Sequence, residues 1–159
     1  MGVKDIYTAE EWQTMLKLPF KIGLALMVIV PSGPIGLTKE TMALAKAPFA
    51  LAQVSNANAL VSALAVELQA QAKAIVKDEE NTFKHSDPQT YKAQTMAACQ
   101  SAAAALSKAS AEDAGAYRTW VLAVGQKVAE AAKDGGVLVS DQEKALLQEL
   151  GGALGGTPA

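Results

Sequence analysis

The chain has 159 residues, of which half are apolar, 19% are charged and 5% are aromatic. This composition excludes a disordered chain, and the length suits one domain that buries about 70% of its unfolded surface. The formal net charge is −2, and the lysines and arginines are scattered among acidic residues. We therefore predict no nucleic-acid partner, because phosphate binding requires clustered positive charge.

The first predicted helix occupies residues 8–30. It starts at a capping box, in which Thr8 and Glu11 have the spacing that lets each side chain bind the other residue's backbone amide. Pro19 lies inside the helical pattern and has no amide hydrogen. It leaves the carbonyl of Met15 without its helical partner and crowds it, so we expect a kink at this point.

Five further helices are expected, since start and stop signals recur along the chain and no window alternates between polar and apolar residues as a strand would. Their expected ranges are 38–54, 60–76, 87–109, 110–134 and 140–154. Alanine is abundant and has the highest helix propensity, which favours closely packed helices. The sequence therefore predicts an all-α fold, a single-domain bundle of about six helices over residues 1–154, with a flexible tail at 155–159.

The third of these helices shows the clearest amphipathic pattern. Its apolar stripe consists of Leu60, Val61, Leu64, Leu68, Ile75 and Val76. The polar stretch that follows, residues 78–87, is predicted to be a loop. Metal-ligand residue types crowd together there around His85, but no pair of ligands has the spacing of one helix face, so we predict a solvated loop and no metal site.

The two ends of the chain share an outline, which covers residues 12–40 and 120–143. Each region has a tryptophan, a helix, a glycine-containing turn, a short apolar segment and a capped glutamate. One interpretation is a pair of pseudo-symmetric helical hairpins that pack around the middle helices. The other is that capped helical hairpins resemble one another because the motif is common.

These regions also resemble two sequence blocks of an uncharacterised family of small bacterial all-helical proteins. One block is residues 31–40, and the other combines residues 117–121, 128–136 and 139–144. The turn after Gly135 is shorter here than the glycine-rich turn of that family. The resemblance covers about a third of the chain with short motifs, and it implies a bacterial, helical protein. It implies no catalytic residue.

Residues that carry chemistry are few. The single cysteine, Cys99, rules out an internal disulfide, fits a reducing compartment and is expected in the core among alanines. A catalytic pair of Cys99 with His85 is disfavoured by their separation. Glu40 and Glu143 form a conceivable acid–base pair, but their places near helix N-termini already have an electrostatic explanation. We predict no catalytic residue, no metal and no cofactor.

The most unusual segment is residues 22–30, which has no polar face and is too short to cross a bilayer. It is expected to be a central core helix, an oligomer interface, or a surface for an apolar ligand or membrane, and core is the commonest of these. Its candidate contact residues are Ile22, Leu24, Leu26, Met27 and Ile29.

Three functions remain open from the sequence. The leading one is a non-enzymatic adaptor, scaffold or homo-oligomer that acts through protein–protein contacts. The second is a binder of a lipid-like ligand or of a membrane or granule surface, and the third is an enzyme whose groups come together from distant positions. The first residues contain no apolar stretch typical of a signal peptide, so we expect a cytoplasmic protein.

Overall fold

The computed structural model describes residues 3–29, 46–52, 58–85, 87–131 and 141–155. Their secondary structure is helical throughout, without strands, as the sequence predicted. The elements are η1 (Val3–Ile6), α1 (Ala9–Ile29), α3 (Ala59–Lys84), α4 (Pro88–Leu106), α5 (Ala111–Ala131) and α6 (Asp141–Ala153), and residues 46–52 are also helical. The turns of the two hairpins that the sequence suggested lie outside the described residues.

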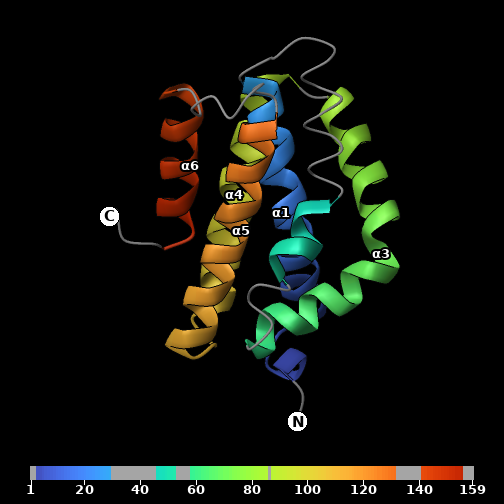
Figure 1. Ribbon diagram of the computed structural model, residues 1–159, viewed down its shortest axis with the longest axis vertical. Helices are drawn as coiled ribbons and strands as arrows, with labels where there is room; N and C mark the ends of the chain where they lie inside the picture. Colours follow the sequence, from blue (N-terminus) through green and yellow to red (C-terminus); the bar gives the residue numbers. More distant parts are fainter. Residues whose placement is uncertain (1–2, 30–45, 53–57, 86, 132–140, 156–159) are drawn as a thin grey trace.

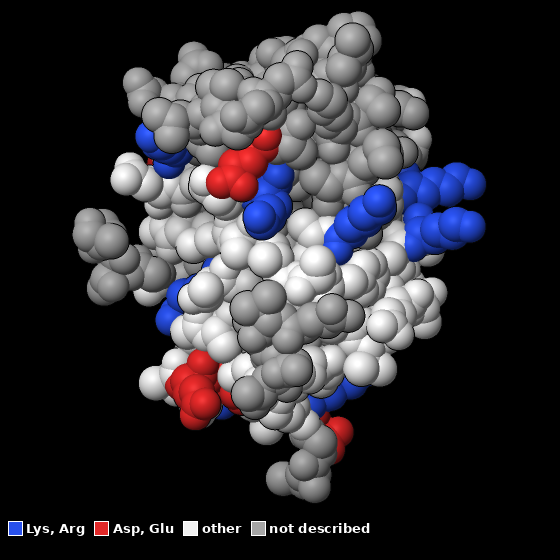
Figure 2. Space-filling model, in the orientation of Figure 1, with Lys and Arg blue, Asp and Glu red and all other residues white. Residues whose placement is uncertain are grey.

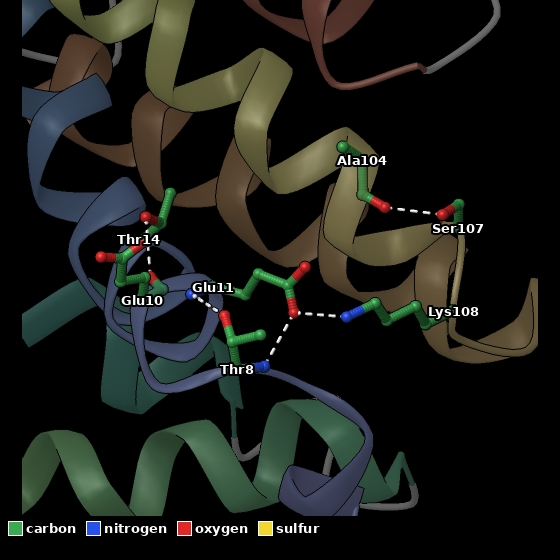
Figure 3. A network of polar contacts seen from close by, with 7 residues as sticks. All are labelled: Thr8, Glu10, Glu11, Thr14, Ala104, Ser107 and Lys108. Carbon is green, nitrogen blue, oxygen red and sulfur yellow. Dashed lines mark hydrogen bonds and ion pairs between the residues drawn. The ribbon is translucent and has the colours of Figure 1, made fainter.

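Helix α1 lies in the middle of the bundle and packs against α3, α4, α5 and α6 (Figure 1). Its apolar residues are buried on every side, from Trp12 and Met15 to Leu26. The predicted capping box is present at its start. The Glu11 amide donates to Thr8 Oγ1 at 3.1 Å, and the Thr8 amide donates to Glu11 Oε2 at 2.8 Å (Figure 3).

The prediction of a loop at residues 78–87 is wrong, because α3 continues to Lys84. The reason is the side chain of Glu79, which lies one turn after Ile75 on the buried face of the helix and has partners in the bundle. Asp87 instead caps α4, since its Oδ1 accepts a hydrogen bond of 2.8 Å from the Thr90 amide, and Pro88 occupies the first turn.

Helix α5 approaches α1 and α6 very closely at Gly125. A Cβ atom at this position would lie 2.9 Å from Ile22 Cγ2 and 2.8 Å from Leu147 Cδ2. The absence of a side chain therefore sets the distance between these three helices. At the end of α6, Arg118 Nε of α5 donates to the Leu154 carbonyl at 2.8 Å, and Gly155 follows with φ of +85°.

Helix α1 runs through Pro19, and the carbonyl that this proline leaves unpaired finds a partner on α5. The hydroxyl of Tyr117 donates to the Met15 carbonyl at 2.9 Å, and both residues are buried. A buried carbonyl without a partner would cost about 1–3 kcal/mol. Tyr117 thus compensates for the proline and fixes the position of α5 along α1.

We predict that Tyr117→Phe lowers the free energy of unfolding by about 1–3 kcal/mol, because the Met15 carbonyl then stays buried without a donor. Chemical denaturation measures this change. In a Pro19→Ala background the amide of residue 19 is available to the same carbonyl, so the cost of Tyr117→Phe should be smaller there. Equal costs in both backgrounds would contradict this account.

Candidate functional site

The apolar segment of α1 is not a free contact surface. Ile22, Leu24 and Leu26 are buried within the chain itself, and Gly125 of α5 packs directly on Ile22. These three residues belong to the core of the described chain, which is one of the alternatives from the sequence, and they offer no exposed contact surface. The side chains of Met27 and Ile29 lie outside the described residues.

A buried polar cluster joins α1, α3 and α4. Lys21 Nζ lies 2.9 Å from Glu79 Oε2, and the hydroxyl of Tyr91 donates to the same oxygen at 3.2 Å. The side chain of Glu79 is 4% exposed and that of Lys21 is 17% exposed. Lys21 Nζ also lies 5.6 Å from the centre of the Tyr91 ring, within the range of a cation–π contact. The cluster holds the second half of α3 against the bundle.

The sequence analysis missed this cluster, although the sequence contains a signal for it. Lys21 interrupts an apolar stretch of α1, and Glu79 continues the apolar stripe of α3 one turn after Ile75. Two opposite charges on two buried faces require each other, because a buried charge without a partner is strongly unfavourable.

A second polar contact holds the first half of α3. Glu67 accepts hydrogen bonds from Lys4 Nζ, at 2.6 Å, and from Trp12 Nε1. The hydrogen bond from Lys4 is the largest cause that lowers the pKa of the Glu67 carboxyl group, and the hydrogen bond from Trp12 adds to it against the opposing effect of burial. Glu67 therefore connects η1, the start of α1 and α3.

The side of α3 that faces away from Glu79 and from the buried stripe of Leu60 to Ile75 is open, and Glu67 lies at its edge. We call this side the α3 outer face, and it consists of the exposed residues Ala59, Val66, Ala70, Lys73, Ala74 and Lys77. Val66 is 68% exposed, and the face carries no charge before Lys73. In Figure 2 the area over the first half of α3 is uncharged, and positively charged side chains border it above.

The composition of α3 is also unusual for a helix on the outside of a bundle. Among the described residues, the stretch Ala59–Glu79 is the one helix long and apolar enough to cross a membrane, and 28% of its most apolar window is buried. Core helices pass the same test. The contacts of Glu67 and Glu79 hold this helix to the rest of the bundle.

The other candidate chemistry does not come together. Cys99 is buried, and burial raises the pKa of its thiol to about 12, so the thiolate required of a nucleophile is not formed at neutral pH. His85 is exposed, and its Nδ1 lies 2.8 Å from the carbonyl of Asn81 on its own helix. In the described part of the chain, no group of three or more His, Cys, Asp or Glu residues is placed to hold a metal ion. Glu40 and the side chain of Glu143 lie outside that part.

No family model, no curated protein and no solved structure matches this chain. The α3 outer face and the polar contacts behind it are therefore interpreted from their own geometry.

We predict that Glu79→Gln lowers the free energy of unfolding by about 2–4 kcal/mol, because it leaves the mostly buried Lys21 ammonium without a counter-charge. Denaturation at neutral pH measures the effect. The double variant Lys21→Met/Glu79→Gln removes that charge and keeps an acceptor for Tyr91, so it should recover most of the loss. A double variant as unstable as the single one would contradict the ion-pair explanation.

The tyrosines give a prediction on pH. The pKa values of Tyr7, Tyr91 and Tyr117, the three tyrosines of the chain, are all raised above 10.0, first of all by burial; the carboxylate of Glu79 adds to this for Tyr91. The folded state thus holds these protons more tightly than the unfolded state. Their contribution to stability is complete below pH 10 and falls as the pH rises above it.

Spectrophotometric titration checks this pH dependence. Tyrosinate absorbance of the native protein should rise at a higher pH than that of the chain unfolded in denaturant. Coincident titration curves would show that the three hydroxyl groups are accessible to water in the folded protein, contrary to the structure.

Proposed function

We propose that this protein acts through contacts with another protein and that the α3 outer face is the contact surface. The observation that supports this most is Val66, which is 68% exposed in the uncharged first half of the α3 outer face. The central parts of protein interfaces are depleted of charge in the same way. The proposed surface is thus on α3, whereas the sequence analysis named residues of α1 as a possible contact surface beside the alternative of a core helix.

The size of the face indicates what kind of contact it supports. At 1.5 Å per residue, the stretch 59–74 is about 24 Å long, and a helix presents a strip about 10 Å wide. The resulting area of roughly 240 Å² is well below the ~800 Å² per partner of a standard stable interface. A transient contact of an adaptor fits this area better than an obligate homodimer.

A second candidate function is attachment to a membrane surface or a lipid-like ligand, which the apolar composition of α3 favours. We rank it second because helices that lie in the membrane interface bury large side chains such as Trp, Phe and Leu. The apolar side chains of the α3 outer face are alanines and one valine. The buried free thiol of Cys99 supports a reducing compartment, and we place the contact in the cytoplasm.

The test is photo-crosslinking in cells that make the protein, with a photoreactive amino acid in place of Val66. We expect a covalent adduct with a protein, because a partner that covers the α3 outer face lies within reach of this position. Ala97 is an exposed alanine on α4 and provides the matched control position, where no such adduct is expected. Absence of a protein adduct at Val66, or equal adducts at both positions, would contradict the proposal.

A further inference from the structure

The hydroxyl group of Tyr7 differs from those of the other two tyrosines. Tyr91 donates to Glu79 Oε2 at 3.2 Å, and Tyr117 donates to the Met15 carbonyl at 2.9 Å. Tyr7 is 8% exposed, and its Oη is the one buried side-chain nitrogen or oxygen of the described residues that has no hydrogen-bond partner in the chain. A buried hydroxyl group left in this way destabilises the fold unless something binds it.

Tyr7 lies at the end of the bundle where α1, α3 and α5 all begin (Figure 1). Asn58 precedes α3, is buried, and accepts a hydrogen bond of 3.0 Å from the Val61 amide through its Oδ1. Its amide group donates to Asp113 Oδ1 in the first turn of α5, at 3.0 Å. This end of the bundle is therefore a polar junction between helix starts, with the unpartnered hydroxyl of Tyr7 beside it.

The charges near Tyr7 are carboxylates. After burial, Asp113 and then Glu11 are the causes that raise the pKa of Tyr7, yet neither carboxylate accepts a hydrogen bond from its hydroxyl group. Both carboxylates repel an anion. The described residues also place no group of three or more His, Cys, Asp or Glu side chains to hold a metal ion here. A neutral ligand that both accepts and donates hydrogen bonds fits these surroundings.

We propose that Tyr7 Oη donates to a buried water molecule, which in turn donates to the carboxylate of Asp113. Buried waters bind polar groups that have no partner in the protein, and they form about three hydrogen bonds each. A water between a hydroxyl and a carboxylate is nearly as favourable as a direct hydrogen bond. The water connects the segment before α1 to the first turn of α5, next to the contact that Asn58 makes from α3.

A crystal structure of the full chain tests the site directly. We expect an ordered water within about 2.6–3.0 Å of Tyr7 Oη and within hydrogen-bond distance of the Asp113 carboxylate. Tyr117 is the matched control, because its hydroxyl donates directly to the Met15 carbonyl and no bridging water is expected there. A direct hydrogen bond from Tyr7 to a protein group, or a Tyr7 hydroxyl with nothing bound, would overturn the proposal.

Unfolding by denaturant gives a second test, in which the sign of the change decides. If the water is bound, Tyr7→Phe removes one of its partners and the midpoint moves to a lower denaturant concentration. If the hydroxyl is unpaired, its removal leaves the midpoint unchanged or raises it, and the proposal fails. In an Asp113→Ala background the water has already lost its other partner, so Tyr7→Phe should lower the midpoint less. Equal shifts in both backgrounds would overturn the bridge to Asp113.

Discussion

The bundle depends on covering a central helix that is apolar on all sides. Helix α1 brings three polar groups into this core: the indole nitrogen of Trp12, the carbonyl of Met15 freed by Pro19, and the ammonium group of Lys21. Each is bound by another helix, through Glu67 of α3, Tyr117 of α5 and Glu79 of α3, respectively. Since a buried polar group without a partner costs on the order of 1–3 kcal/mol, these contacts fix how the neighbouring helices are placed along α1.

Two of these three contacts position α3, and they determine which of its faces is open. Trp12 and Lys21 are nine residues apart on α1, and their partners Glu67 and Glu79 are twelve apart on α3, so the two helices run in the same direction. The curved path of α3 in Figure 1 accommodates its longer segment between the contacts. Glu79 and the apolar stripe of α3 point into the bundle and Glu67 lies at the edge of the helix contact, so the α3 outer face points away from the bundle.

The helices were largely predictable because their signals are local. The capping box at Thr8, the Asp87–Pro88 start of α4 and the stripe from Leu60 to Ile75 involve residues within a few turns, and the structure has each as expected. The predicted end of the third helix failed because its continuation depends on a partner far away in the chain. Lys21 and Glu79 are 58 positions apart, and polar composition alone favoured a loop.

The candidate site was not predictable, for a related reason. An all-round apolar segment such as residues 22–30 indicates burial, but the sequence does not specify whether the same chain or another one covers it. Conversely, alanines at Ala70 and Ala74 are equally suited to a helix contact and to solvent. Only the arrangement of the other helices shows that α1 is covered and that the outer face of α3 is not.

The contacts that hold α3 in the bundle do not involve the residues of its exposed side, so that side is free to change without loss of the fold. A helix on the outside of a bundle often gains stability from ion pairs along its exposed side, and such pairs then restrict which residues can stand there. On α3 these polar contacts join Glu67 and Glu79 to other elements of the bundle, and the exposed side relies on the helix propensity of alanine. Substitutions at Val66, Lys73 or Lys77 therefore remove no contact that holds the bundle together. A surface of this kind is able to change its partner specificity while the fold stays the same, which is the property that a binding protein requires.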